Sequence, residues 1–437
     1  MRRIFVPLAI AALACQPASA QPQAGIAATP PADQPPTTPL TTPPTTPVAQ
    51  PTKGLSLDGA LQAALSRNAQ MRAAALGVEA SSGALQQAGL LPNPVLDVEQ
   101  EDTRPETRST TVLLSQTVEL GGKRAARIGL GQLNRDLAAA ELAARQADIR
   151  ASTIEAFFGV LIAQEKLKVA VESTKLASSG AEAVSRRVMA GKVSPTEETR
   201  SKVAEATARI ELSRARSEQA MALRALAAVV GAPQGSISQV DGDPATMPSL
   251  PTGAELTDRL QQAPALRRAR LEVERAEAAY RLERARATPD VTVGVGAKRM
   301  QEQGRTAPMF SVSIPLPVFD RNQGSQLEAL RRRDAAQAQA EADESRLQSE
   351  VLQSIDQLEA RREELALLRR DVLPGAEIAH QAARRGFELG KFGFLDVLDA
   401  QRTLLQARDQ YFAALAVAHR LAADIERRLG APPNERR

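Results

Sequence analysis

Histidine and cysteine, which supply most zinc ligands and many catalytic groups, are nearly absent from this chain of 437 residues. The two histidines, His380 and His419, lie far apart in the sequence, and the single cysteine, Cys15, lies close to the start. Two histidines and one cysteine at these positions cannot form a structural zinc site, a disulfide framework or a cysteine–histidine nucleophile pair. The sequence therefore predicts no catalytic residues, no cofactor and no resident metal, and we do not expect an enzyme.

Four carboxylates are better candidates for functional groups. Asp396 and Asp399 are spaced i, i+3, which places them on one face of a helix. Glu197 and Glu198 occupy a similar place in the first half of the chain. In a symmetric oligomer these side chains would form acidic rings, which favour cations and can constrict a pore. We predict that they gate a lumen; the alternative is that they are ordinary solvated residues of a long helix.

Two short segments that contain glycine precede these carboxylates. Arg385 to Gly390 reads Arg-Gly-Phe-Glu-Leu-Gly, and Arg186 to Gly191 reads Arg-Arg-Val-Met-Ala-Gly, so that Ala190 stands in the place of Leu389. Glycine adopts the left-handed conformation that ends many helices, so each segment can reverse one helix into the next. We expect both segments to form the tips of helical hairpins.

The elements that must position these residues are mainly helical. Strong helix formers (Ala, Leu, Arg, Glu and Gln) dominate the chain, whereas β-branched and aromatic residues are scarce. Charged residues make up 24% of the chain, and the net charge of +4 comes from basic and acidic residues that are interspersed. This distribution argues against nucleic acid as a partner.

The first 20 residues have the features of a signal peptide. Two arginines precede an apolar run from Ile4 to Ala14, and Ala18-Ser19-Ala20 provides the small residues that a signal peptidase recognises. Cys15 lies in an approximate lipoprotein context, so lipidation there is the alternative to cleavage after Ala20. Residues 21–53 are rich in Pro and Thr, which predicts an extended linker. No later stretch approaches the roughly 20 apolar residues of a membrane-spanning helix.

The rest of the chain is a tandem repeat. The matching landmarks are 197 to 199 residues apart: Pro92 and Pro289, Ser115 and Ser313, Gly191 and Gly390, and Gly231-Ala232-Pro233 and Gly430-Ala431-Pro432. A nearly constant offset over so many landmarks indicates two copies of one unit. We place the repeats at 54–231 and 254–431, with a linker at 232–253 and a tail at 432–437.

Each repeat has the same predicted order of elements: a helix, two strands, a long helix, a turn and a final helix. The predicted ranges are 55–90 and 255–287 for the opening helices, 95–100, 111–120, 291–295 and 310–316 for the strands, and 123–189 and 320–388 for the long helices. Apolar residues alternate with small or polar ones along the strands, which predicts one apolar face. We expect breaks in the long helices at Ser178-Ser179-Gly180 and at Pro374-Gly375.

The small number of strands has a consequence for assembly. Four short strands cannot close a β-barrel, and lipid does not tolerate an open sheet edge because its backbone groups lack hydrogen-bond partners. If the strands enter a membrane, three chains would provide twelve strands and would close both a β-barrel and a barrel of helices. The alternative is a small sheet that packs on helices in a soluble protein.

The duplicated architecture resembles the TolC-like outer-membrane factors of tripartite efflux systems over residues 54–431. Leu114 to Arg127 (Leu-Ser-Gln-Thr-Val-Glu-Leu-Gly-Gly-Lys-Arg-Ala-Ala-Arg) is similar to the strand-to-helix junction of the branch that exports divalent cations, the cobalt-zinc-cadmium and nickel-cobalt-cadmium resistance channels. The resemblance implies a mainly α homotrimer with a small β part: a twelve-stranded barrel in the outer-membrane lipid of a Gram-negative bacterium and an α-barrel in the periplasm. Family barrels usually carry an aromatic girdle, and here only Phe310 and Phe319 lie near strands.

The resemblance also implies a function and partners. A proton-driven inner-membrane pump of the RND type would supply the energy, and a periplasmic adaptor would connect the pump to this chain. Nickel, cobalt, cadmium or zinc ions would leave through the lumen, which gives metal resistance. Arg385, Leu389 and Gly390 match the Arg-x-x-x-Leu-Gly motif at the periplasmic tip where adaptors dock, and Arg186 and Gly191 are their counterparts. The alternatives are export of drugs or organic compounds by the same fold, and a periplasmic coiled-coil scaffold that forms no channel.

Overall fold

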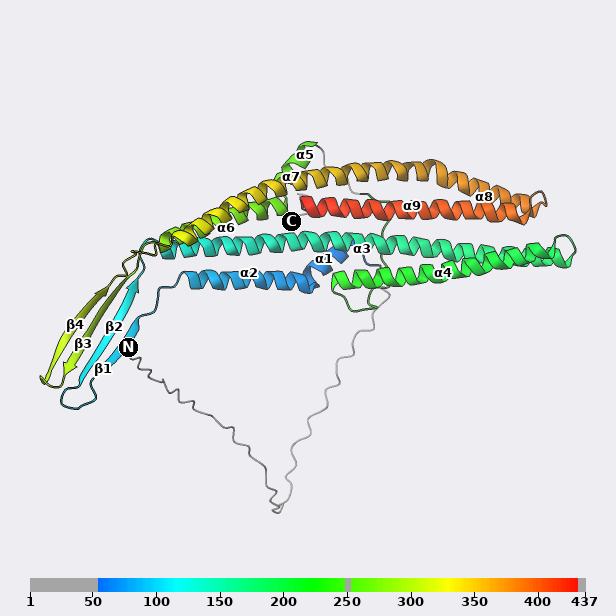
Figure 1. Ribbon diagram of the computed structural model, residues 1–437. Helices are drawn as coiled ribbons and strands as arrows, with labels where there is room; N and C mark the ends of the chain where they lie inside the picture. The colour runs from blue at the N-terminus through cyan, green and yellow to red at the C-terminus, as the bar shows by residue number, and fades with distance from the viewer. Residues whose placement is uncertain (1–53, 248–252, 431–437) are drawn as a thin grey trace, which may run out of the picture. The chain divides into compact units, whose positions relative to one another are not determined.

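A computed structural model describes residues 54–247 and 253–430. The predicted signal peptide with Cys15, the predicted linker 21–53 and the predicted tail 432–437 lie outside these residues. The described chain is mainly helical and contains one antiparallel sheet of four strands, as the sequence predicts (Figure 1).

Both halves of the chain have the same order of elements. The first half contains α1 (Leu57–Arg67), α2 (Ala69–Ala88), β1 (Val95–Glu101), β2 (Ser109–Val118), α3 (Lys123–Met189) and α4 (Pro195–Val230). The second half contains α5 (Gly253–Gln261), α6 (Pro264–Arg286), β3 (Val291–Met300), β4 (Arg305–Ser313), α7 (Gln323–Leu367), the π-helix η1 (Leu368–Val372), α8 (Leu373–Glu388) and α9 (Phe394–Leu429). None of these helices has a stretch that is both long and apolar enough to cross a bilayer.

The helices form a wall that α3 follows along its length (Figure 1). Next to the sheet, α3 packs against α2 and α6, and α6 packs against α7. Farther from the sheet, α4 and α9 take the places of α2 and α6 beside α3, and α8 continues α7. Within the described residues the wall therefore has two outer columns, one made by α2 and α4 and the other by α7 and α8.

The segment that connects the two halves is held tightly against the middle of the wall. Val240 is 1% exposed, and both of its backbone groups bond to Gln164: Nε2 donates to the carbonyl oxygen at 3.1 Å, and Oε1 accepts from the amide at 3.0 Å. His419 stacks on Phe158, with 3.6 Å between ring centroids, and bonds to the carbonyl oxygen of Pro244 at 2.7 Å. Because buried backbone groups must be paired, these bonds fix the path of the connection.

The sheet joins the two halves through its central pair of strands. The strand order is β1-β2-β3-β4, and every neighbouring pair is antiparallel. Leu114 of β2 pairs with Leu96 of β1 and with Val295 of β3, which in turn pairs with Phe310 of β4. Within the described residues, the outer edges of β1 and β4 have no pairing strand.

The register gives the sheet one apolar and one polar face, because paired residues lie on the same face and successive residues alternate. The apolar face carries Leu96, Val98, Val112, Leu114, Val118, Val291, Val293, Val295, Phe310 and Val312. The polar face carries Asp97, Glu99, Glu101, Thr111, Ser115, Thr117, Thr292, Lys298, Ser311 and Ser313. Most apolar-face side chains are exposed, and Phe310 is 80% exposed. The predicted apolar face is thus confirmed.

Two predictions about the helices need correction. The opening helices are each divided, at Asn68 and at Ala263. Asn68 ends α1 in an extended conformation and caps α2, where its side chain accepts a bond from the Gln70 amide at 2.7 Å. The break predicted at residues 178–180 is wrong, because α3 is continuous from Lys123 to Met189. A Cβ added at Gly180 would lie 3.5 Å from the Phe394 ring, an ordinary packing distance between α3 and α9.

The other predicted break is confirmed. Pro374 lies at the start of α8, directly after the π-helix η1. Proline has no backbone N–H and cannot continue the α-helical hydrogen-bond pattern, which accounts for the altered pattern just before it. In the sheet, β4 ends at Ser313 rather than at residue 316, because Pro315 and Pro317 cannot donate to a neighbouring strand.

Candidate functional site

The two glycine-containing segments form matching hairpin tips at the ends of α3 and α8. At the first tip, the Gly191 amide donates to Val188 at 2.9 Å and the Lys192 amide donates to Arg187 at 2.9 Å. At the second tip, the equivalent bonds run from Gly390 to Phe387 at 3.0 Å and from Lys391 to Gly386 at 2.8 Å. The glycines have φ values of +68° and +73°. Both turns are therefore Schellman-type helix ends that require glycine.

Arg187 joins the two tips. Its Nη2 atom donates to the carbonyl oxygens of Phe387 at 3.0 Å and Glu388 at 3.3 Å, and its guanidinium lies 4.2 Å from the centroid of the Phe387 ring. The last carbonyl groups of a helix have no partner within the helix and carry partial negative charge. A cation from α3 thus satisfies the end of α8.

The sequence prediction missed Arg187 and named its neighbour Arg186. Arg186 is exposed, and the ion pair that its side chain makes within the described part of the chain is a long one, to Glu182 at 3.9 Å. Arg187 is equivalent to Gly386 in the second repeat, 199 residues later. A side chain at Gly386 would collide with Phe392, since an added Cβ would lie 2.1 Å from its Cδ2 atom. The sequence signal for Arg187 was that the two repeats have different residues, arginine and glycine, at this equivalent position.

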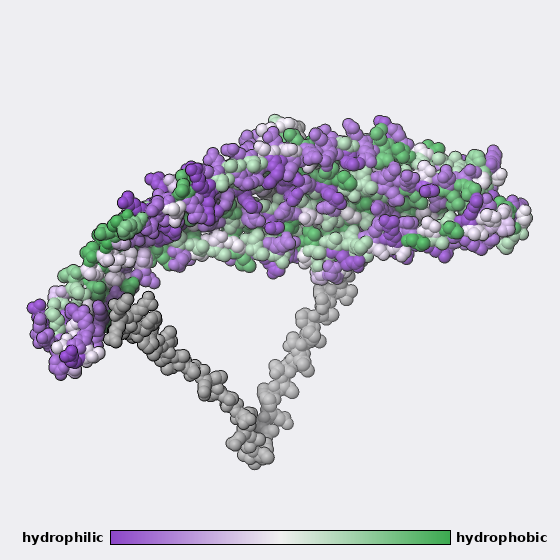
Figure 2. Space-filling model, viewed as in Figure 1, coloured by the Kyte–Doolittle hydropathy of each residue, from purple (hydrophilic) through white to green (hydrophobic). Residues whose placement is uncertain are grey.

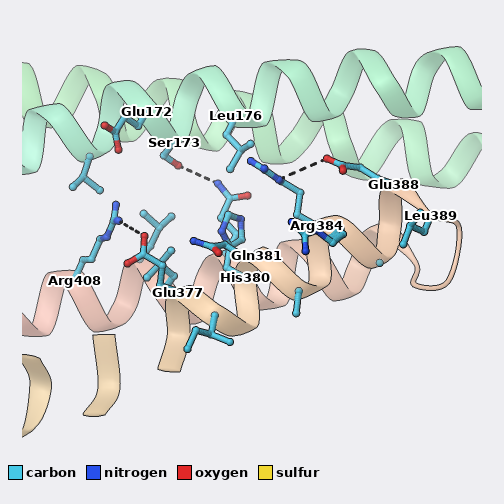
Figure 3. Close-up of a pocket in the computed structure, with 18 residues that line it drawn as sticks. Glu172, Ser173, Leu176, Glu377, His380, Gln381, Arg384, Glu388, Leu389 and Arg408 are labelled. Carbon is cyan, nitrogen blue, oxygen red and sulfur yellow. Dashed lines mark hydrogen bonds and ion pairs between the residues drawn. The ribbon is translucent and has the colours of Figure 1, made fainter. Parts of the chain in front are cut away.

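A groove of about 720 Å³ lies beside the second tip, between α3, α8 and α9 (Figure 3). Its lining includes Arg385 and Leu389, two residues of the predicted docking motif. Leu389 is 67% exposed. An ion pair between Arg408 and Glu377, at 3.6 Å, joins α9 to α8 across its wall. The groove places both motif residues at a concave surface that another polypeptide can contact.

His380 lies in the lining of the same groove. The side chain is 8% exposed, and its Nε2 atom has no hydrogen-bond partner among the described residues. Burial, and then the charges of Arg384 and Arg408, lower the pKa of His380, whereas Glu377 opposes them. The imidazole is therefore neutral at neutral pH.

The predicted gate carboxylates lie on two helices that flank α3 on opposite sides, α9 and α4. Asp396 accepts a bond from the Gly393 amide at 2.9 Å and so caps α9, while Asp399 is exposed one turn farther on. Glu198 pairs with Lys202 at 2.8 Å, which lowers its pKa, and Glu197 has one buried oxygen without a hydrogen-bond partner among the described residues. A single chain does not bring the two pairs together.

A second cluster of charges holds the junction between strands and helices. Lys123, at the start of α3, pairs with Asp290 at 2.7 Å, just before β3. Arg127 pairs with Glu119 through both carboxylate oxygens. Arg124 donates to the Gly89 carbonyl oxygen at 2.7 Å, which satisfies the end of α2. The segment from Leu114 to Arg127 therefore connects parts of both repeats.

The comparison with known families matches this duplicated architecture. A family model for outer membrane efflux proteins matches the chain twice, at residues 60–232 and at residues 256–431. The chain belongs to the outer membrane efflux protein family. Among curated relatives, the cobalt-zinc-cadmium resistance protein CzcC of Cupriavidus metallidurans is 41% identical over 432 residues, which cover 98% of this chain and 100% of CzcC. The nickel-cobalt-cadmium resistance protein NccC of Alcaligenes xylosoxydans xylosoxydans is 28% identical over 296 residues, 64% of each chain.

Solved structures of other proteins share the fold. CusC has a TM-score of 0.74 at 18% identity, and the match covers 86% of this chain and 92% of CusC. The outer membrane protein VceC of Vibrio cholerae has a TM-score of 0.73 at 20% identity, and the match covers 86% of this chain and 96% of VceC. In this efflux protein, the described residues contain no group of three His, Cys, Asp or Glu side chains that could hold a metal ion.

Proposed function

We propose that this efflux protein is the outer-membrane channel of a tripartite system that exports divalent heavy-metal cations and so gives resistance to them. The observation that carries the proposal is the 41% identity to a cobalt-zinc-cadmium resistance protein along the full length of that relative. The likeness to NccC adds nickel to the candidate cargo. The cargo passes through as a substrate, and the energy comes from a proton-driven RND pump in the inner membrane.

The working form is a homotrimer. Each chain presents two unpaired strand edges and an apolar sheet face, and three chains of four strands each supply the twelve strands that close the sheet. Closure satisfies every strand edge, which lipid requires. The two outer columns of the helical wall meet those of the neighbouring protomers in the same arrangement.

The tips carry the contacts with partners. Arg186, Gly191, Arg385, Leu389 and Gly390 dock the periplasmic adaptor, and the exposed Leu389 beside the groove supports this assignment. Threefold repetition places Asp396, Asp399, Glu197 and Glu198 around the lumen as a cation-favouring constriction. The exposed Asp399 is the best placed of the four, because Asp396 and Glu198 already have partners within the chain.

The domain boundaries complete the proposal. Residues 1–20 direct export and are removed, residues 21–53 form a linker, and the repeats occupy 54–231 and 254–431. Mass spectrometry of the mature protein tests the first step. A chain that begins at Gln21 supports it, whereas an acylated chain that begins at Cys15 replaces the signal peptide by a lipoprotein signal.

Two measurements test the function. A deletion strain should become sensitive to cobalt, zinc, cadmium or nickel salts and should recover when the gene is returned. Detergent extraction of the outer membrane should yield a complex with the mass of three chains. Sensitivity to organic compounds without metal sensitivity would reassign the cargo, and a soluble periplasmic monomer or dimer would replace the channel by a scaffold.

A further inference from the structure

Two arginines lie at the free end of the sheet, where Figure 2 shows hydrophilic side chains beyond the apolar part. Arg299 is the last residue but one of β3, and Arg108 directly precedes β2. Both side chains are exposed, and neither has a hydrogen-bond or ion-pair partner among the described residues. These two cations are therefore free to bind a ligand from outside the chain.

The register places both arginines on the apolar face of the sheet. Arg299 pairs with Thr110 of β2, which lies two residues from Val112 of the apolar face. The carbonyl oxygen of Arg108 accepts a bond from the Gln301 amide at 3.0 Å, so the same pairing continues one residue beyond the strand. Arg108 therefore lies diagonally beside Arg299 on this face. Such positions are about 7–8 Å apart, a distance that long side chains span to reach one ligand.

The carboxylates at this end of the sheet do not neutralise the two arginines. Glu101 lies on the polar face and pairs with Lys298 at 2.7 Å. Asp102 accepts a bond from a backbone amide of the β1–β2 turn at 3.1 Å. Glu106 and Glu302 lie in the two turns and form no ion pair with either arginine. Within the described residues, the apolar face thus ends in two cations without a counter-charge.

The two arginines lie directly beyond the apolar side chains of the face. Eight residues of strand separate Arg299 from Val291 at the helical end of β3, which is about 26 Å along the strand. The apolar band of an outer-membrane barrel is about 25 Å tall, so Arg299 lies near the edge of the band that is opposite to the helices. With the helices in the periplasm, this edge faces the outer leaflet.

Arginine at this level is suited to bind phosphate. Its planar guanidinium donates two parallel hydrogen bonds to a phosphate and stays charged at any physiological pH. Two guanidinium groups carry two positive charges, which match the charge of about −1.5 to −2 on a phosphate monoester at neutral pH. A single phosphate monoester can therefore satisfy both side chains.

We propose that Arg108 and Arg299 bind the phosphate monoester of a phosphorylated glycolipid in the outer leaflet, so that each protomer has a lipid site at the free end of its sheet. The two cations neutralise the phosphate directly. The site therefore needs no divalent cation as a bridge, and the proposed cargo does not displace the lipid. The inference rests on the proposed function, because it requires the apolar face to lie in lipid and the helices to lie in the periplasm.

Native mass spectrometry of the full-length complex in detergent measures how much glycolipid each variant binds. The probe is lipid A with both phosphates, and dephosphorylated lipid A and inorganic phosphate are the reference ligands. The test variant is Arg108→Gln combined with Arg299→Gln. The matched control is Arg305→Gln, because Arg305 is exposed and without a described partner at the same end of the sheet, but on the polar face. We expect the double variant to bind lipid A at least about tenfold more weakly than the parent, and R305Q to bind like the parent, with or without EDTA.

The other outcomes overturn the inference. Equal weakening by R305Q would mean that lipid A responds only to the general charge of the sheet end. Equal binding of dephosphorylated lipid A would mean that its acyl chains alone are recognised, and displacement of lipid A by an equal concentration of inorganic phosphate would mean a free-phosphate site. Loss of lipid A in EDTA would mean that a metal ion bridges the phosphate to the protein. Each of these results in a complex with the mass of three chains leaves the proposed function standing, whereas a soluble monomer or dimer overturns both.

Discussion

At the residue scale, Arg187 and Gly386 shape the contact between the two hairpin tips. Arg187 of the first repeat is equivalent to Gly386 of the second. The first position has a long side chain and the second has none. The arginine reaches across to the last carbonyl groups of α8, while the glycine leaves room for the Phe392 ring. The bond between the two tips thus depends on a difference between the repeats at this position.

We expect Arg187→Ala to loosen the second tip. The variant loses two charge-assisted hydrogen bonds and the stacking on Phe387, together worth on the order of 1–3 kcal/mol. Hydrogen exchange of the amides at 387–391 should speed up by about tenfold or more, since about 1.4 kcal/mol corresponds to a factor of ten. The matched control is Arg186→Ala, which removes a long surface ion pair and should change exchange little. Equal effects of the two variants would contradict a specific role for Arg187.

We expect the stability of the helical wall to fall as the pH drops below about 6.5, the ordinary pKa of histidine. Burial lowers the pKa of both His380 and His419. As the pH falls, these two histidines therefore bind protons in the unfolded chain before they do so in the folded chain. Their contribution is fully present above the unfolded pKa and is lost as the pH falls toward the lower folded pKa. Unfolding midpoints in detergent at about pH 7.5 and about pH 5.5 measure the loss.

His380→Gln isolates one of the two histidines. Glutamine does not titrate, so the midpoint of this variant should depend less on pH than that of the parent protein. His419 remains in the variant, which should therefore keep part of the dependence. An unchanged pH dependence would show that His380 contributes nothing to it.

At the scale of elements, the glycines at and near the second hairpin tip have different roles. Gly390 supplies a positive φ, and Gly386 supplies space for Phe392. Gly375 lies in the same helix as Gly386 and has open space around it. Substitution of Gly386 therefore tests packing against Phe392, and substitution of Gly375 tests helix propensity alone.

We expect Gly386→Ala to destabilise the second tip and Gly375→Ala to leave it intact. The new methyl group at Gly386 collides with the Phe392 ring, and such overpacking costs about 1–3 kcal/mol. At Gly375 alanine meets no neighbour and is the better helix former by up to about 1 kcal/mol. Limited proteolysis at residues 386–394 measures both effects. A G386A tip as resistant as that of the parent would mean that the ring moves aside at no cost.

The sequence predicted most of the elements because their signals are local. Alternation marked the four strands, Pro92 and Pro289 marked the ends of the opening helices, and the glycines marked the tips. The break at Gly180 was predicted wrongly because helix α3 is stabilised by packing on α9, a long-range contact that composition does not reveal. The role of Arg187 was missed for the same reason, because its hydrogen-bond partners are 200 and 201 residues away in the sequence.

At the scale of the whole molecule, the exposed edges and the apolar face of the sheet are the features that need covering. The sheet has one apolar face, and its two outer edges have no pairing strand among the described residues. Lipid tolerates such edges only when other strands pair with them. The trimer could be proposed from the sequence only through the count of strands and the family resemblance. The register adds physical support, because it shows which side chains lie on each face.

We expect a lysine on one face of β4 to block assembly and a lysine on the next residue to be tolerated. Phe310, which pairs with Val295 near the middle of β3, lies on the apolar face, and Ser311 lies on the polar face. A lysine near the middle of a bilayer costs about 2–4 kcal/mol per chain on the lipid side, while the opposite side faces water. Phe310→Lys should therefore reduce the amount of trimer extracted from the outer membrane, and Ser311→Lys should not. Similar yields for both would mean that the sheet does not separate lipid from water.

The long helical tracts of the two repeats also differ in continuity. Helix α3 has 67 residues without interruption, and at 1.5 Å per residue it reaches about 100 Å. Its counterpart in the second repeat is divided by the π-helix η1 between α7 and α8. We expect a load applied at the tips to bend the second repeat at η1 before it bends α3, because the π-helix interrupts the α-helical hydrogen-bond pattern there.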